Sequence, residues 1–301
     1  MTTPDHVMSA DWWWEAVSET VGKEWGRIET RGGGGEVVAS MPYQITRRGP
    51  FTAMLMPELT QTGHIRTSPD ADRGEALKAL IAALRAKMKS ERTLMVQISD
   101  YMTEADKSIL REEGFELSDR VSYKIKPDAA GNVASRLYPD KRHRYRKACG
   151  NFSLDEGMTP AELYDEIEKA YVNVRYPRSL FLRLADTAIK NGNGMILRAK
   201  ATDGSTAASA FLALDSEAAY YLTPAINPAH RSDGANEWLT VQSIEHVLSR
   251  GMTFDFEGSM VPGIASSFRH YGGSPDHYTF ATLYRPQFIR HIVGVLMAHK
   301  K

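Results

Sequence analysis

The chain has 301 residues, of which 42% are hydrophobic, and its 37 basic and 37 acidic side chains give a formal net charge of zero. This length suggests about two domains, and it is long enough to bury a core without disulfides or metals. The single cysteine, Cys149, excludes an intramolecular disulfide and any metal site built from several cysteines. The balanced charge gives no strong nucleic-acid signal.

The sequence shows no apolar run near the roughly 20 residues that a membrane helix needs. Its first residues lack the basic segment followed by an apolar segment that marks a signal peptide. The nine histidines have no metal-binding spacing, so no metal site is expected. We therefore expect a soluble, cytoplasmic protein with no membrane span.

The first half of the chain alternates strand and helix patterns. Ser9 precedes a short helix that contains Trp12, Trp13 and Trp14. Apolar alternation predicts strands at 23–30, 36–45, 51–56, 93–98 and 121–126. Helical periodicity predicts helices at 73–90 and 103–113. The four glycines at 32–35 predict a hairpin turn between the first two strands.

The second half has a similar order of elements. Strands are predicted at 194–201, 207–214, 218–223, 253–256 and 277–284, and helices at 160–171, 179–191, 235–250 and 261–271. A basic helical stretch at 134–150 precedes them, and a last helix is predicted after Pro286. The pattern of the whole chain is that of a mixed α/β protein.

The two halves form an internal repeat. TLMVQISD aligns with MTFDFEGS, and the closing prolines Pro127 and Pro286 are 286 − 127 = 159 residues apart. Each half is predicted to be a three-stranded meander followed by helix, strand, helix and strand. We predict one unit at 1–133 and a second at 134–301. Chance similarity of two ordinary α/β halves is the alternative interpretation.

Three segments carry a resemblance to a known family. They are DKRHRYRKACG, GANEWLTVQSIEHVLSRG and FDFEGSMVPGIASSFRHYGG, all in the second half. They resemble motifs of the tandem GNAT-like (acyl-CoA N-acyltransferase-like) proteins, which include the FemAB/FemX peptidoglycan aminoacyltransferases and related BioF2-like acetyltransferases. The first 130 residues match only in their predicted architecture.

This resemblance implies a fold class and an activity. The fold class is α/β (α+β), with two tandem GNAT-like units that each have a mixed central sheet flanked by helices. The activity is transfer of an acyl or aminoacyl group to an amine, such as a small molecule or a peptidoglycan precursor. The implied acyl donors are acetyl-CoA, another acyl-CoA or an aminoacyl-tRNA. The tRNA-using members have a coiled-coil arm, and the sequence has no heptad run for one.

Asp255 and Glu257 alternate with two phenylalanines at the end of a short strand. A partly desolvated carboxylate there would have a raised pKa and could take a proton from an attacking amine. Gly258 and Ser259 could donate hydrogen bonds to a developing oxyanion. The alternative is that Asp255 caps the next helix and Glu257 is solvated.

A phosphate site is predicted where a helix begins at Gly234, because free N–H groups and the positive end of the helix dipole face an anion there. Arg231 could add a charge-assisted bond. The resemblance implies a loop with small residues at the last position, which Asn236 occupies. Lys141 and Arg144 of the basic stretch could bind a diphosphate or an acidic peptide. An ordinary helix N-cap and a solvated helix face are the alternatives.

The remaining candidates follow from strand ends and from the resemblance. Tyr221 ends a central strand and could orient the substrate or act as an acid, although strand tyrosines commonly lie in a core. Arg175 and Tyr176 lie in a loop that approaches the acceptor site in the family. Arg269 matches a basic position of the family and could meet a carboxylate or a phosphate.

We therefore interpret the chain as an enzyme that transfers an acyl group to an amine by direct attack. An acetyl-CoA-dependent N-acetyltransferase is a second interpretation. A third is a non-catalytic ligand-binding protein on a degenerate transferase fold. A nucleic-acid-binding role for the basic helix would require binding that falls steeply with salt.

Overall fold

A computed structural model describes residues 6–63, 65–131 and 133–286 of the chain. Its contacts divide the chain into two compact units. Unit 1 comprises the residues up to Asp119 together with those from Tyr278 onward, and unit 2 is Arg120–His277. Among the described residues, no helix has the length and apolar character required to cross a membrane. The helix predicted after Pro286 lies outside the described residues.

Unit 1 is built around a mixed sheet whose strand order is β1-β2-β3-β5-β12, with β4 paired to β2. Its helical elements are η1 (Val7–Ser9), α1 (Asp11–Glu19), α2 (Arg73–Ser90) and α3 (Glu104–Glu112). Its strands are β1 (Glu24–Arg31), β2 (Val37–Arg48), β3 (Phe51–Leu55), β4 (Arg66–Thr67) and β5 (Thr93–Asp100), and β12 (Ser274–Tyr284) enters from the end of the described chain. The predicted strand and helix order of this half is confirmed, and the two-residue strand β4 was not predicted.

The two faces of the unit 1 sheet are covered by helices. Alternate residues of β2 point to opposite faces, so Met41 joins the apolar core under α2 while the amide of Gln44 donates to Ser18 Oγ of α1 at 2.9 Å. In α1, Trp13 and Trp14 are fully buried, and their indole N–H groups donate to Thr60 Oγ1 and the carbonyl of Met8. The tryptophan helix therefore contributes to the core.

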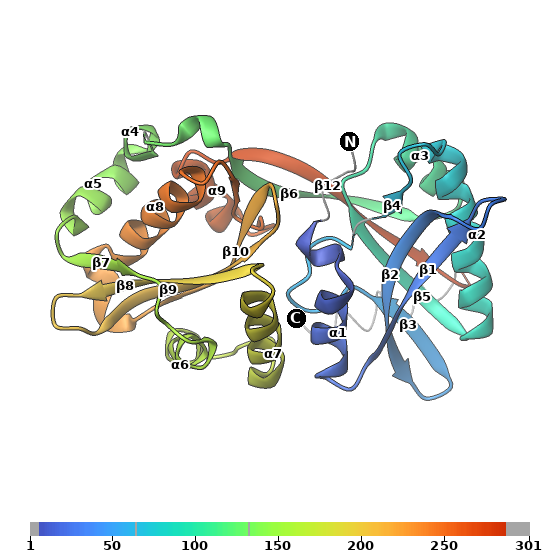
Figure 1. The fold of residues 1–301 in the computed structure, drawn as a ribbon, viewed down its shortest axis with the longest axis horizontal. Helices are drawn as coiled ribbons and strands as arrows, with labels where there is room; N and C mark the ends of the chain where they lie inside the picture. The colour runs from blue at the N-terminus through green and yellow to red at the C-terminus, as the bar shows by residue number, and fades with distance from the viewer. Residues whose placement is uncertain (1–5, 64, 132, 287–301) are drawn as a thin grey trace. The chain divides into compact units, whose positions relative to one another are not determined.

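Unit 2 has the strand order β6-β11-β10-β9-β8-β7. Its strands are β6 (Glu116–Ile125), β7 (Phe152–Asp155), β8 (Gly194–Ala201), β9 (Thr206–Leu214), β10 (Ala218–Ile226) and β11 (Thr253–Asp255). Its helices are α4 (Val133–Arg136), α5 (Pro139–Ala148), α6 (Pro160–Ala170), α7 (Arg178–Lys190), α8 (Ala235–Leu248) and α9 (Pro262–His270), with the 3₁₀ turns η2 (Pro127–Ala129) and η3 (Pro228–Asp233). Figure 1 shows α5 and α8 on one side of strands β7–β9 and α6 and α7 on the other.

The order of elements repeats as predicted. A meander, a helix, a strand, a helix and a strand occur as β1-β2-β3-α2-β5-α3-β6 and again as β8-β9-β10-α8-β11-α9-β12. The pairing registers of β5 with β12 and of β6 with β11 give the sequence offset between the two repeats. Val96 lies opposite Leu283, and Phe254 lies opposite Ile125. Because 254 − 96 = 158 and 283 − 125 = 158, the offset of the core strands is one residue less than that of the prolines.

The last strand of each repeat completes the sheet of the other unit. β12 pairs with β5 in unit 1, and β6 pairs with β11 in unit 2. The division of the contacts therefore falls at 119/120 and 277/278. The boundary predicted between 133 and 134 separates the two repeats along the sequence, and it stays a prediction.

The turn between β11 and α9 requires a glycine at position 258. Its φ is +66°, and a Cβ atom there would lie 2.1 Å from the carbonyl oxygen of Val121 and 2.8 Å from Cα of Ser122. We predict that Gly258→Ala destabilises the protein by about 2–4 kcal/mol, because both the left-handed backbone and the backbone contact oppose a side chain.

The matched control is Gly263→Ala in α9, where a Cβ would have no described heavy atom within 4 Å. That change should be neutral or stabilise the helix by up to about 1 kcal/mol. Urea unfolding of both variants measures the difference, and equal stabilities would contradict this account of the turn.

Candidate functional site

Two acidic residues lie at the end of β11, the strand between β6 and β10 in unit 2. β11 ends at Asp255, and its Oδ1 atom accepts the backbone N–H of Glu257 at 2.8 Å. This bond holds Glu257 at φ +62°, a left-handed conformation that is uncommon for a residue with a side chain. Gly258 is also left-handed, and Ser259 Oγ then accepts the N–H of Val261 just before α9. Non-glycine residues held in this conformation cluster at functional sites.

The neighbouring strand β6 supplies a hydroxyl and a cation to Asp255. The side chain of Asp255 is fully buried, and Ser122 Oγ donates to its Oδ1. Lys124 Nζ lies 3.5 Å from Asp255 Oδ2 and 2.7 Å from Asp276 Oδ2. The register places Lys124 directly opposite Asp255 in an antiparallel pair, so the two side chains share one face of the sheet.

Burial raises the pKa of Asp255, and the Lys124 ammonium and the Ser122 hydroxyl oppose this rise. Burial also raises the pKa of Glu257 well above its ordinary value, and the charge of Asp255 raises it further while Lys124 lowers it. Because the two carboxyl groups interact, their ionisation is coupled. Glu257 is partly exposed as a residue although its Oε1 atom is buried, whereas Asp255 is fully buried. Glu257 is therefore the less buried residue of the pair.

Tyr220 of β10 adds a third side chain to this face. It lies opposite Asp255 in the parallel β10–β11 pair, and its hydroxyl donates to Asp215 Oδ2 at 2.7 Å. Burial, followed by the charge of Asp215, raises the pKa of Tyr220. Lys124, Asp255 and Tyr220 thus form a row across three adjacent strands, which we call the polar row.

β10 separates from β11 just beyond the polar row. The two strands pair only through 218–220 and 253–255, while β10 continues to Ile226. The β9–β10 register shifts between Tyr221 and Thr223, which is a β-bulge of the kind that often lies beside active sites. Tyr171 Oη donates to the carbonyl of Pro224 in this stretch at 2.8 Å. The polar row therefore lies where the sheet opens.

The corresponding positions of unit 1 are uncharged. With the offset of 158, Asp255 and Lys124 correspond to Gln97 and Thr282, which also lie opposite each other. The chain itself fills the place beyond this pair, since Gly63 N–H donates to the carbonyl of Ser99 at 2.8 Å and Ile65 N–H donates to Asp100 Oδ2 at 2.7 Å. An acid paired with a base at this position is thus found in unit 2 and not at its counterpart in unit 1.

Tyr221 lies on the opposite face of the sheet from the polar row. It packs in the core of unit 2, with its ring 5.5 Å from that of Phe254, and burial raises its pKa. Its neighbour Tyr220 occupies the position beside Asp255. The catalytic role predicted for Tyr221 stays a prediction, and this placement does not support it.

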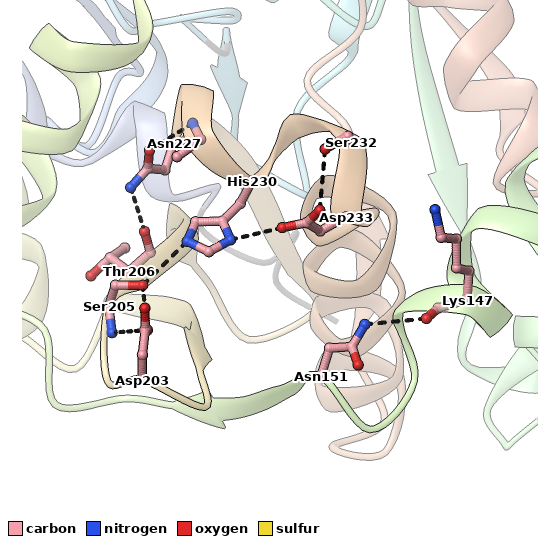
Figure 2. A network of polar contacts seen from close by, with 10 residues as sticks. Lys147, Asn151, Asp203, Ser205, Thr206, Asn227, His230, Ser232 and Asp233 are labelled. Carbon is pink, nitrogen blue, oxygen red and sulfur yellow. Dashed lines mark hydrogen bonds and ion pairs between the residues drawn. The ribbon is translucent and has the colours of Figure 1, made fainter.

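The predicted phosphate residues meet at the start of α8, but their charges are largely satisfied within the protein. Glu237 in the first turn of α8 is buried, and its Oε1 atom lies 3.1 Å from Lys141 Nζ and 3.6 Å from Arg144 NH1. The carbonyl oxygen of Arg144 is 2.9 Å from the place of a Cβ on Gly234. The Asn236 amide lies 3.5 Å from the hydroxyl of Tyr271. The loop before Gly234 is anchored by the contacts in Figure 2.

The other predicted residues lie at separate places in unit 2. The guanidinium of Arg231 is exposed and donates to the carbonyl of Ala170 at 3.3 Å. Arg269 is exposed in α9 and donates to Tyr123 Oη of β6 at 3.2 Å. Arg175 and Tyr176 line a hollow of about 470 Å³ in the loop between α6 and α7, which Tyr164, Glu168 and Tyr171 also line. The roles of all these residues stay predictions.

The sequence analysis missed Ser122, Lys124 and Asp276. The alternation of polar residues in 121–126 places Ser122 and Lys124 on one face of a strand. The alternation does not show which strand lies beside β6. β6 belongs to the first repeat of the sequence, but it pairs with β11 of unit 2. Among the described residues, no group of three or more His, Cys, Asp or Glu is arranged to hold a metal ion.

Comparison with known proteins identifies similarities of sequence and of fold. A family model described as an acetyltransferase (GNAT) domain matches residues 120–278. A comparison with curated proteins found no match. Among solved structures, FemX has a TM-score of 0.76 at 15% identity, covering 95% of this chain and 94% of that chain.

Two further solved structures share the fold. A tandem GNAT protein from the clavulanic acid biosynthesis pathway has a TM-score of 0.60 at 15% identity, covering 87% of this chain and 83% of its own. L-PGS from Bacillus licheniformis has a TM-score of 0.57 at 12% identity, covering 99% of this chain and 97% of its own. These similarities establish the predicted fold class of tandem GNAT-like units, each with a mixed sheet flanked by helices.

The raised pKa of Glu257 gives a testable dependence of stability on pH. Because the folded state holds the proton of Glu257 more tightly than the unfolded chain, stability is lost as the pH rises from the unfolded pKa to the folded one. Glu257→Gln removes this loss. The variant should be more stable than the wild type at pH 8 and about equally stable at pH 4.

Urea unfolding at the two pH values measures this effect. Glu217→Gln, which changes an exposed glutamate of the same unit, is the matched control and should show no such dependence. A Glu257→Gln variant that is equally stable or less stable at pH 8 would show that burial does not raise this pKa.

Proposed function

The chain belongs to the GNAT acetyltransferase domain family, and from this premise we propose that it transfers an acyl group to an amine acceptor with Glu257 as the general base. The observation that carries the proposal is the coupled pair of Asp255 and Glu257, with raised pKa values, where β10 and β11 separate. A carboxylate whose pKa is raised above its ordinary value is a stronger base and is better suited to accepting a proton from an ammonium group.

The proposed reaction is direct attack by the amine. The nitrogen lone pair attacks the acyl carbonyl carbon, the C–N bond forms, and the bond to the leaving group of the donor breaks. Glu257 takes the proton that the amine loses. Asp255 is a positioning residue, because its Oδ1 atom holds the backbone of Glu257 and its charge raises the pKa of Glu257. Ser259 accepts a hydrogen bond from Val261, and its own hydroxyl hydrogen can stabilise the oxyanion.

The hollow at Arg175 and Tyr176 is proposed to hold an anionic group of the acceptor. Its volume of about 470 Å³ lies in the range of small-ligand sites. Tyr171 lines it and also donates to the carbonyl of Pro224, four residues along β10 from Tyr220. Four residues of strand span roughly 13 Å. This spacing suits an extended acceptor, such as a peptide or a peptidoglycan precursor, better than a very small amine.

A GNAT domain implies an acyl-coenzyme A donor, and the start of α8 is the place expected for its diphosphate. The residues there do not fit that group. The carboxylate of Glu237 already neutralises Lys141, and the carbonyl of Arg144 lies against Gly234. A diphosphate would meet these negative oxygens at close range. We therefore assign no step to coenzyme A and propose a donor whose binding does not depend on this loop.

The proposed function is tested by acyl transfer from two donors, acetyl-CoA and alanyl-tRNA, to lysine and to a lysine-containing pentapeptide, with mass spectrometry of the amide product. We predict no product from acetyl-CoA, because the start of α8 does not fit a diphosphate, and product from alanyl-tRNA would identify an alternative donor. The rate should decrease about 100-fold or more in Glu257→Gln and should fall as the pH drops through the raised pKa, because only the carboxylate accepts a proton. Glu217→Gln should match the wild type.

A second variant separates chemistry from folding. Asp255→Gln combined with Lys124→Thr installs the uncharged pair of unit 1 in unit 2, and it should fold and lose transfer. If the Glu257→Gln variant transferred the acyl group at the wild-type rate, Glu257 would be excluded as the general base. Absence of amide from both donors would count against the transferase assignment and favour a ligand-binding role.

A further inference from the structure

The ammonium group of Lys124 is shared between two carboxylates that lie on either side of it. Asp255 is on β11 and Asp276 is on β12, and both strands are neighbours of β6, which carries Lys124. Lys124 Nζ lies 2.7 Å from Asp276 Oδ2 and 3.5 Å from Asp255 Oδ2. The first distance is that of a charge-assisted hydrogen bond, and the second is longer than an ordinary hydrogen bond. Asp276 therefore holds the ammonium more closely than Asp255 does.

The two carboxylates differ in their exposure to solvent. The side chain of Asp276 is 42% exposed and that of Lys124 is 27% exposed, whereas that of Asp255 is fully buried. Water screens the outer pair, which therefore contributes little to the stability of the fold. The charge of Asp255 has no such screening, so the distance of the ammonium from it has a larger effect. The outer pair thus acts mainly through where it places Lys124.

The charged positions on β11, β6 and β12 have uncharged counterparts in unit 1. With the offset of 158, Asp276 corresponds to Ser118, because 276 − 118 = 158. The counterparts of the lysine and the buried aspartate are Thr282 and Gln97. Ser118 Oγ donates to the carbonyl of Phe280 at 3.3 Å. The outer acid thus occurs in the repeat position that also has the buried acid and the base, as expected if the three side chains act as one group.

The charge of Lys124 acts on both acids at the end of β11. It opposes the rise in the pKa of Asp255 and of Glu257 that burial causes. Tyr220 is the remaining titratable side chain of the polar row, and burial and the charge of Asp215 raise its pKa, so it is uncharged near neutral pH. Because Coulomb interactions weaken with distance, an ammonium held nearer Asp276 lowers the base strength of the two acids less.

We propose that Asp276 is a positioning residue that draws the ammonium of Lys124 away from Asp255 and so preserves the base strength of Glu257. This inference rests on the proposed function, in which Glu257 is the general base. Without a carboxylate at position 276, the ammonium closes the gap to Asp255 and stabilises both inner carboxylates in their charged form. Glu257 then holds a proton less tightly and is a weaker base towards an incoming ammonium.

A ¹³C NMR titration of the Glu257 carboxyl group in the full chain tests this role without any acyl transfer. Asp276→Asn should lower the midpoint relative to the wild type, and Asp276→Glu should restore it, because the carboxylate is retained. Lys124→Gln should raise the midpoint, since the ammonium that lowers it is gone. The matched control Asp186→Asn, at an exposed aspartate of α7 in the same unit, should leave the midpoint unchanged.

The double variant of Asp276→Asn with Lys124→Gln separates the placing of the ammonium from the direct charge of Asp276. The shift caused by Asp276→Asn should be largely lost when the lysine is absent. A shift of equal size in both backgrounds, or a wild-type midpoint in Asp276→Asn, would overturn the proposal. If Lys124→Gln does not unfold cooperatively in urea, the ¹⁵Nζ resonance of Lys124 decides. It should move in Asp276→Asn, and an unchanged resonance would equally overturn the proposal.

The pH profile of transfer separates this inference from the proposed function. In Asp276→Asn the rise of the transfer rate with pH should begin at a lower pH than in the wild type, because the base loses its proton earlier. A shifted titration with no amide from either donor would reject the proposed function and leave the role of Asp276 in place. An unshifted titration and an unshifted pH profile, with transfer intact, would reject the role of Asp276 alone.

Discussion

The site depends on keeping the carboxyl group of Asp255 inside the protein. Burying a charged carboxylate without partners is costly, and β6 offsets this cost with the hydroxyl of Ser122 and the ammonium of Lys124. With these partners in place, Asp255 can fix the backbone of Glu257 in a left-handed conformation and raise its pKa. The chemistry proposed for Glu257 is therefore a consequence of which strand lies beside β11.

The strand beside β11 is β6 because the two repeats exchange their last strands, so that β6 pairs with β11 and β12 pairs with β5. If β6 had closed the sheet of unit 1, Asp255 would have met the residues of β12 at its side. Instead β6 brings Lys124 opposite Asp255, while unit 1 has Gln97 opposite Thr282 at the corresponding place. The first repeat thus has a neutral pair at this place in its sheet, and the second has an acid opposite a base. The duplication supplies the framework, and the strand exchange makes its two copies chemically different.

Much of this structure is encoded locally and could be predicted from the sequence. The helix at Arg73–Ser90 follows from its apolar spacing, and the acidic strand end at Asp255 and Glu257 follows from alternation with phenylalanine. The pairing of β6 with β11 joins residues about 130 positions apart along the chain, and no local pattern specifies it. For the same reason the sequence did not indicate Lys124. The β10–β11 register, which places Tyr220 rather than Tyr221 beside Asp255, is equally non-local.

The central claim is that burial and the charge of Asp255 hold the proton of Glu257 more tightly than in an ordinary glutamate. The most direct measurement is a ¹³C NMR titration of the Glu257 carboxyl group in the wild type and in Asp255→Asn. The account predicts a midpoint well above the usual value of about 4.3 in the wild type, and a lower midpoint in the variant because the neighbouring charge is gone. An ordinary midpoint in the wild type, unchanged by the substitution, would contradict it.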